Sequence, residues 1–328
     1  MAISAKDVSE LRKATGAGMM DCKKALNESG GDFDGALDYL RKKGQKVVAK
    51  RADRDVTEGT VVALTNEAGD KGLVMALSCE TDFTAKNDVF VDMAKNVAAL
   101  AMEKLPATKE DLATLELDGA PVVEKLNGLT AVVGEKMEVS QYALIEGSNI
   151  ASYIHAGSKI GVVVSYKDGG KGDEAAQFFR SVAMHIAAMS PSIMRPEEFE
   201  ADFVAKETEA IQAQIKAENE LNEAENLGKP QKKIPQYVSK LQLTPEVLAK
   251  AEEDIKAELA AEGKPEKIWD KIVPGKLERF ISDNTSLDQE RCLMSQTFAL
   301  DDTKTVEQAV KDFADGAELL GYARVAVG

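Results

Sequence analysis

One short segment, residues 80–87, combines residue types that suit contact with another molecule. It reads ETDFTAKN, which sets Phe83 among acidic, hydroxyl and basic side chains. It follows a β-forming run and precedes an amphipathic pattern, so we expect a loop between a strand and a helix. An aromatic ring gains little from lying in water, so Phe83 is either a plug for its own domain or a wedge for another protein's pocket. The residue types leave these two interpretations even.

A second segment, residues 15–26, places two methionines at the start of a predicted helix. It reads TGAGMMDCKKAL. Met19 and Met20 are adjacent, so both are not expected to face a small core, and flexible thioethers suit a partner surface. The alternative is one buried methionine and one at the rim. The GAG run is a weak signal for an anion site and is more typical of a helix-breaking turn.

The residues that usually carry catalysis are few and scattered. His155 and His185 do not stand at metal-ligand spacing, and Cys22, Cys79 and Cys292 are far apart, as in a protein with reduced thiols. His185 falls mid-helix and is expected in the core, whereas His155 sits at a turn where contact and incidental roles are equally supported. No Walker-type loop, GxGxxG or GxSxG occurs. We therefore expect no enzyme activity, no metal and no cofactor.

The charge distribution bears on partners. The formal net charge is −15, which argues against a nucleic-acid-binding protein. Residues 1–54 hold 12 basic and 8 acidic side chains, so a small basic head precedes an acidic body that can steer a protein partner. No secretory leader or membrane-length apolar run is present, so a cytoplasmic protein without membrane contact is expected.

The hydrophobic patterns predict the elements that position these segments. Residues 4–52 read as three short helices, the last of which runs into a basic linker over 41–54. Residues 59–64 and 72–77 then read as two antiparallel strands, and 88–102 as a helix.

The same strand-strand-helix pattern returns further along the chain. Residues 148–153, 160–166 and 174–189 repeat it at an offset of about 88 residues, which indicates an internal duplication. Residues 196–262 are rich in Glu, Lys and Ala, with apolar residues at helical spacing, and they predict two long antiparallel helices. A surface hairpin and a partner-binding arm explain them equally well. A final alternating strand is expected over 322–327.

The sequence therefore predicts an α+β protein with duplicated core subdomains and an inserted antiparallel helical hairpin or coiled coil. The expected domains are residues 1–54, 55–140, 141–194 with 266–328, and the arm 195–265.

Four motifs make the chain resemble the bacterial translation elongation factor Ts family. They are residues 11–26, 79–86, 152–164 and 184–188, which occur in order along the chain, and the resemblance covers most of residues 1–325. The resemblance implies a UBA-like fold for the N-terminal helices. It also implies a non-enzymatic guanine-nucleotide exchange factor, which binds GDP-bound elongation factor Tu and speeds release of GDP. Whether the pair assembles through a homodimer or a heterotetramer is left open.

The family's site residues carry over onto matching positions. Arg12, Met19 and Met20 would contact the GTPase domain of elongation factor Tu. The segment Thr81, Asp82, Phe83 and Thr84 would enter near the Mg²⁺ site, where Phe83 acts as the wedge and Asp82 disturbs the metal. His155 would lie near this contact.

Two departures from the family pattern stand out. Thr84 replaces a usual aliphatic residue, which makes the expected wedge more polar, and residues 218–254 lengthen the arm. The chain ends soon after its last strand, so the C-terminal helical module of some members is not expected. The alternatives to an exchange factor are a scaffold or holdase-like binder and an enzyme.

Overall fold

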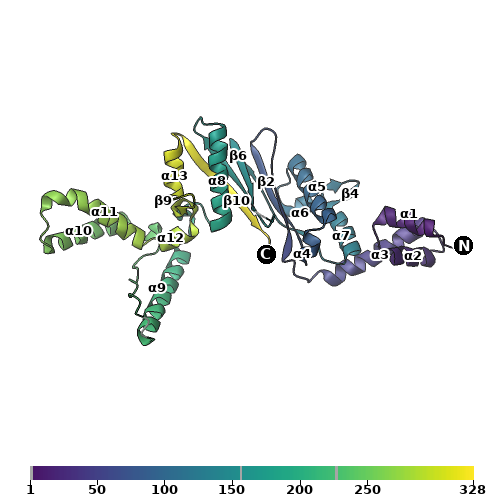
Figure 1. Cartoon of the computed structure of the whole chain (residues 1–328), viewed down its shortest axis with the longest axis horizontal. Helices are drawn as coiled ribbons and strands as arrows, with labels where there is room; N and C mark the ends of the chain where they lie inside the picture. The colour runs from purple at the N-terminus through teal and green to yellow at the C-terminus, as the bar shows by residue number, and fades with distance from the viewer. Residues whose placement is uncertain (1–2, 156, 226–227) are drawn as a thin grey trace. The chain divides into compact units, whose positions relative to one another are not determined.

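The computed structural model describes residues 3–155, 157–225 and 228–328, so Ala156 of the third motif lies outside it. The chain divides into two compact units (Figure 1). The first comprises Met1–Ala187 and Gly316–Gly328, and the second is Ala188–Asp315. Helices and small antiparallel sheets make up the protein, which confirms the α+β class. No helix in the described ranges is long and apolar enough to cross a membrane.

The first unit begins with the three predicted helices. They are α1 (Ala5–Thr15), α2 (Met19–Glu28) and α3 (Phe33–Arg51). Ser4 caps α1 in a capping box: its hydroxyl accepts from the Asp7 amide, and the Asp7 carboxylate accepts from the Ser4 amide. Leu11, Cys22 and Leu26 form the buried centre of this small domain. The basic stretch is not a separate linker, because α3 continues through it to Arg51.

Two three-stranded antiparallel sheets form the body of the first unit. One contains β1 (Glu58–Thr65), β2 (Lys71–Cys79) and β5 (Glu138–Glu146), and the other β6 (Asn149–Ile154), β7 (Ile160–Asp168) and β10 (Ala317–Ala326). The central strands are β2 and β7, the two strands that the duplication aligns. The expected domain boundary between residues 140 and 141 falls within β5. All four expected domain boundaries remain predictions.

The sheets pack against each other through small and β-branched side chains. Val61, Val74 and Ala76 of the first sheet share one buried cluster with Val163 and Val325 of the second. A Cβ at Gly161 would lie 2.6 Å from Cγ1 of Val61, so glycine is needed for this close approach.

Helices cover the outer faces of the two sheets (Figure 1). Phe90 of α5 (Asp88–Lys104) packs with Leu73 and Met75 of β2, and Phe179 of α8 (Asp173–Met189) stacks on Tyr166 of β7. The connections between β2 and β5 contain further short elements, which are α4 (Asp82–Ala85), α6 (Lys109–Thr114), β3 (Glu116–Leu117), β4 (Ala120–Pro121) and α7 (Val122–Val133).

The second unit is mainly helical and has its own buried clusters. Its main elements are α9 (Ala201–Ala224), α10 (Pro245–Ala261), α11 (Trp269–Asp283), α12 (Ser286–Arg291), β8 (Thr297–Phe298), β9 (Asp301–Thr305) and α13 (Val306–Phe313). Val204, Val238 and Leu287 belong to one cluster, and Ile255, Leu259 and Val273 to another.

An antiparallel helical hairpin is present, but it does not pair the two helices of residues 196–262. Among the described residues, α10 packs along α11 and not along α9. Helix α9 instead holds the returning chain through its side-chain amides: Asn219 donates to the Lys232 carbonyl at 2.8 Å and Gln212 to the Pro235 carbonyl at 2.9 Å. The apolar stripe of α10 therefore faces the next helix in the chain, which a short connection brings back over it.

Candidate partner-binding site

The Thr81–Thr84 segment is a helical turn rather than the expected loop. Residues Asp82–Ala85 form α4, and Thr81 is its N-cap: the Thr84 amide donates to the Thr81 hydroxyl at 3.4 Å, and the Ala85 amide to the Thr81 carbonyl at 3.1 Å. Asn87 then caps α5 by accepting from the Val89 amide at 2.9 Å. Two capping residues in quick succession thus order the segment, a signal that was present in the sequence.

The turn sorts its side chains between solvent and core. Phe83 is 84% exposed, whereas Thr84 is 7% exposed and Ala85 is also buried. Successive residues of a helical turn point in different directions, so Thr84 anchors the turn while Phe83 projects from it. The plug interpretation of Phe83 is therefore wrong for the free protein.

Asp82 is also at the surface, but it already has a cationic partner. Its Oδ2 lies 2.7 Å from Nζ of Lys86, one helical turn further on. This hydrogen bond from Lys86 holds the pKa of Asp82 below its ordinary value, and the more distant charge of Lys159 acts in the same direction. Asp82 is consequently ionised at neutral pH.

The turn that carries His155 meets the same edge of the first sheet. The Val61 amide donates to the Ser158 carbonyl at 2.7 Å, and Lys159 forms an ion pair with Glu58. Lys159 is near enough to affect the pKa of Asp82. His155 itself is exposed, and its Nδ1 lies 3.1 Å from the Tyr153 hydroxyl. Both predicted contact elements therefore lie at this edge.

His185 and the cysteines belong to the interior. His185 is 1% exposed in α8, which confirms it as a core residue. All three cysteines are free and buried. Burial raises the pKa of Cys79 to about 12, and its thiol donates to the Thr81 carbonyl at 3.2 Å. Within the described ranges, no group of three or more His, Cys, Asp or Glu side chains is arranged to hold a metal ion.

The two adjacent methionines both lie at the surface. Met19 is 59% exposed and Met20 is 74% exposed at the start of α2, whose buried residues Cys22, Ala25 and Leu26 come later in the helix. The alternative with one buried methionine is therefore wrong. Arg12, in the last turn of α1, is exposed as well.

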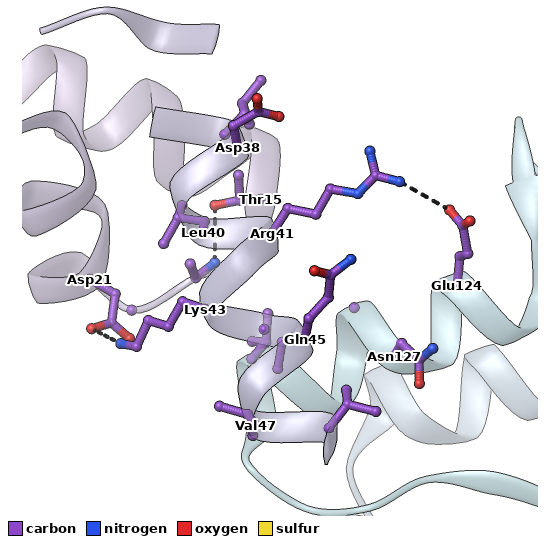
Figure 2. Close-up of a pocket in the computed structure, with 18 of the residues that line it drawn as sticks. Thr15, Asp21, Asp38, Leu40, Arg41, Lys43, Gln45, Val47, Glu124 and Asn127 are labelled. Carbon is purple, nitrogen blue, oxygen red and sulfur yellow. Dashed lines mark hydrogen bonds and ion pairs between the residues drawn. The ribbon is translucent and has the colours of Figure 1, made fainter. Parts of the chain in front are cut away.

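A groove of about 990 Å³ runs between α3 and α7 in the first unit. Figure 2 shows its ion pairs, Lys43 with Asp21 inside the helical domain and Arg41 with Glu124 across to α7 at 3.8 Å. Gly44 of α3 lets the two helices approach, since a Cβ there would lie 2.7 Å from the Cβ of Ala131. These contacts connect the helical domain to the body of the unit.

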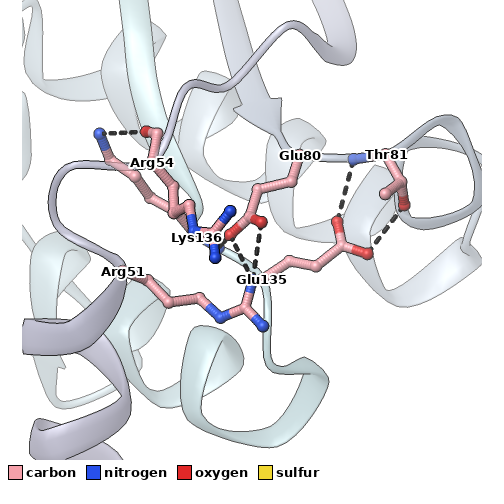
Figure 3. A network of polar contacts seen from close by, with 6 residues as sticks. All are labelled: Arg51, Arg54, Glu80, Thr81, Glu135 and Lys136. Atoms are coloured by element: carbon pink, nitrogen blue, oxygen red, sulfur yellow. Dashed lines mark hydrogen bonds and ion pairs between the residues drawn. The ribbon is translucent and has the colours of Figure 1, made fainter.

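Three charged side chains, those of Arg51, Glu80 and Glu135, come together beside Thr81 at the base of α4 (Figure 3). Glu80 belongs to the segment 80–87 that the sequence indicates, whereas Arg51 and Glu135 are not indicated by the sequence. Thr81 and Glu135 are 54 positions apart, and charged residues of this kind occur throughout the chain, so no local pattern could identify the contact.

Fold and site together define a class of protein: a multi-domain α+β protein that presents exposed apolar side chains on ordered turns, as proteins that bind other proteins do.

Comparison with known proteins gives the family. The family model for elongation factor Ts matches residues 80–234 and 231–328. A protein of Rhodopirellula baltica named elongation factor Ts is 66% identical over 325 residues, which cover 99% of each chain. Proteins of the same name from Flavobacterium johnsoniae and Campylobacter fetus are 46% and 43% identical, over 99% and 100% of this chain and 99% and 95% of theirs. The chain belongs to the elongation factor Ts family and is accordingly an elongation factor of protein biosynthesis.

Proposed function

We propose that this protein is a guanine-nucleotide exchange factor for elongation factor Tu. It binds the GDP-bound GTPase, disturbs the Mg²⁺ and phosphate site, and promotes GDP release so that GTP can bind. The observation that carries the proposal is Phe83, which is 84% exposed on a turn held by its buried neighbours. The activity belongs to the cytoplasm and requires neither nucleic acid nor a membrane.

Exchange of this kind needs binding energy rather than catalytic groups. A factor that binds the empty GTPase more tightly than the nucleotide-bound one weakens nucleotide binding by the same ratio. Mg²⁺ bridges and neutralises the phosphates, so displacing it removes a principal attraction for GDP. An ordered turn that carries one aromatic residue and one carboxylate can supply that displacement.

The side chains of the turn divide this task. Phe83 enters the partner as the wedge, and Thr84 supports it from beneath, since Thr84 is buried and Phe83 is exposed. Asp82 must give up its 2.7 Å contact with Lys86 before it can act on a metal site, so its contribution is smaller. Arg12, Met19 and Met20 form a second contact with the GTPase domain, and His155 adds to the first. Whether a homodimer or heterotetramer forms is a matter for a mass measurement on the complex.

The test measures release of fluorescent GDP from elongation factor Tu against concentration of this protein. We expect wild type to raise the release rate by orders of magnitude. Phe83→Ala should lower that acceleration by roughly 30-fold, which corresponds to the loss of a hot-spot contact worth about 2 kcal/mol. Asp82→Asn should have a smaller effect.

Leu300→Ala is the matched control, because Leu300 is also exposed, at 57%, but lies in the second unit. It should leave the release rate unchanged, and neither alanine variant should lower the melting temperature appreciably. An unaltered release rate with folded wild type would overturn the proposed function. Full activity of Phe83→Ala would remove the wedge role alone.

A further inference from the structure

At the base of α4, the carboxylates of Glu80 and Glu135 each accept a hydrogen bond from the backbone amide of the residue that follows the other glutamate. The Lys136 amide donates to Oε1 of Glu80 at 2.7 Å, and the Thr81 amide donates to Oε2 of Glu135 at 3.1 Å. The two hydrogen bonds are therefore reciprocal (Figure 3). Reciprocal contacts of this kind fix two chain segments in one register, because neither can shift without breaking two charge-assisted bonds.

Glu135 also sets the cap of the turn. The Thr81 hydroxyl donates to Oε1 of Glu135 at 2.8 Å and accepts from the Thr84 amide. The carboxylate thus orients the hydroxyl so that its lone pair faces the first turn of α4. Without Glu135, the Thr81 side chain would be free to rotate, and its hydroxyl would form hydrogen bonds with water instead of being held toward the Thr84 amide.

The end of α7 delivers Glu135 to this position. Gly134 ends α7 in the left-handed conformation, with φ of 82°, and its amide donates to the Thr130 carbonyl at 2.8 Å. A residue with a side chain is strained at that φ, so glycine permits the sharp exit from the helix. The next residue then reaches the turn.

Arg51 ties the same point to the N-terminal helices. Its Nη1 lies 2.8 and 2.7 Å from the two carboxylate oxygens of Glu80. The pair is sheltered, with side-chain exposure of 34% for Arg51 and 16% for Glu80. Burial favours a raised pKa for Glu80, but the bonds from the Lys136 amide and Arg51 outweigh it and hold the pKa low. Arg51 is the last residue of α3, whose first half belongs to the helical domain.

We propose that Glu135, Glu80 and Arg51 form a clamp that holds the α4 turn ready for its partner, with Phe83 projecting before any contact is made. Glu135 is a positioning residue in this clamp, since it acts through Thr81 and does not reach Phe83. Arg51, through its ion pair with Glu80, connects the turn to α3. The helical domain that carries Met19 and Met20 and the turn that carries Phe83 are therefore parts of one connected frame. This inference rests on the proposed exchange function.

The structural test uses the full-length protein alone. Amide hydrogen exchange of residues 81–85 should be at least about tenfold faster in Glu135→Ala than in wild type, since the cap loses its fixed acceptor. Glu135→Gln retains one acceptor oxygen and should fall between the two. The central amides of β2 serve as the internal reference and should not change. Unchanged exchange at residues 81–85 in Glu135→Ala would overturn the clamp.

The functional test separates positioning from affinity. For Glu135→Ala, the GDP release rate at saturating concentration should fall about tenfold, while the half-saturating concentration changes less than about threefold. Arg51→Ala should act in the same direction, and Arg51→Lys should recover part of the rate. Lys167→Ala, which removes an exposed ion pair with Glu318 at 2.7 Å, is the matched control and should behave as wild type.

The possible results are distinct. A maximal rate in Glu135→Ala equal to wild type would overturn the proposal, as would a loss that merely follows the fraction of unfolded protein in a thermal melt. If the wild-type protein does not accelerate GDP release from elongation factor Tu, the proposed function is wrong. The hydrogen-exchange comparison then still tests, on its own, whether the clamp orders the turn.

Discussion

At the scale of single residues, the candidate site is defined by which side chain the turn exposes. Phe83 and Thr84 are neighbours in sequence, yet one is 84% and the other 7% exposed. The polar residue at position 84 therefore adds nothing to the surface that a partner meets. Thr84 as a whole is buried, and the projecting ring of Phe83 is the part available for binding.

A second residue, Asp288, is notable because it is a buried carboxylate. It is 0% exposed in α12. Its Oδ2 accepts from the Lys240 amide at 2.7 Å, and in the described part of the chain Oδ1 has no hydrogen-bond partner. Burial raises the pKa of Asp288, although the bond from the Lys240 amide opposes the shift. The folded protein therefore binds this proton more tightly than the unfolded chain does.

The sign of the pH effect follows from that difference. The contribution of protonated Asp288 to the free energy of unfolding is fully present below the pKa of about 3.9 in the unfolded chain. It is lost as pH rises through the higher pKa of the folded protein. Asp288→Asn removes this dependence, so the stability of the variant relative to wild type should increase as pH rises from about 4 to 7. Urea unfolding followed by fluorescence of Trp269, the single tryptophan, measures it in the second unit.

Asp283→Asn is the control for this prediction, because Asp283 is exposed and close in sequence. Its stability relative to wild type should stay flat over the same pH range. A flat profile for Asp288→Asn as well would show that the buried carboxylate has no raised pKa.

At the scale of elements, the contact between α3 and α7 connects the helical domain to the sheets. Its closest point is Gly44 against Ala131, where an added Cβ would approach to 2.7 Å. Glycine within a helix normally weakens it by about 1 kcal/mol relative to alanine. Here the close packing of the two helices gives that position a reason to be glycine.

The substitution Gly44→Ala should therefore have opposite effects in two backgrounds. In wild type it should destabilise the first unit by about 1 kcal/mol, because overpacking of 1–3 kcal/mol outweighs the gain in helix propensity. In Ala131→Gly it should stabilise by about 1 kcal/mol, since only the propensity term remains. Urea unfolding followed by circular dichroism completes the double-mutant cycle. Equal effects in both backgrounds would mean that the helices do not press on each other.

At the scale of the whole molecule, the chain is two units with separate cores. The first unit holds the sheets and the candidate site, and the second holds the α10–α11 hairpin. A deletion of residues 218–254, the segment that lengthens the arm, would remove Val238, which is fully buried in the second unit. Such a deletion would measure unfolding of that unit as much as any role in binding.

Because the cores are separate, the units should not unfold as one two-state system. Leu259→Ala, in the hairpin core, should lower the stability reported by Trp269 fluorescence by about 2–5 kcal/mol and leave the sheet transition in place. Leu73→Ala, in the core of the first sheet, should lower the stability of the first unit, followed by circular dichroism, and leave the transition reported by Trp269 fluorescence in place. Both leucines are at most 1% exposed, so they are matched in burial. Shifts of both transitions by either variant would instead indicate one cooperative molecule.

The sequence by itself determined what depends on neighbours along the chain. The periods of 2 and 3.6 in hydrophobicity predicted β1, β2 and α5 and their repetition as β6, β7 and α8, because side-chain alternation is a local property of each element. The two adjacent methionines likewise indicated that they do not both face the core, and they left open whether one of them is buried. Long motifs then gave the family, which no single residue could have done.

Tertiary structure decided which distant residues meet. An apolar stripe such as that of α10 shows that a helix must be covered, but any nearby helix with a similar stripe could cover it, and the choice of α11 over α9 came from the complete packing. The exposure of Phe83 likewise depended on Thr84 occupying the space beneath the turn. Glu135 beside Thr81 was invisible along the chain, because a charged side chain is equally well satisfied by water and becomes specific only when folding brings its partner within 3 Å.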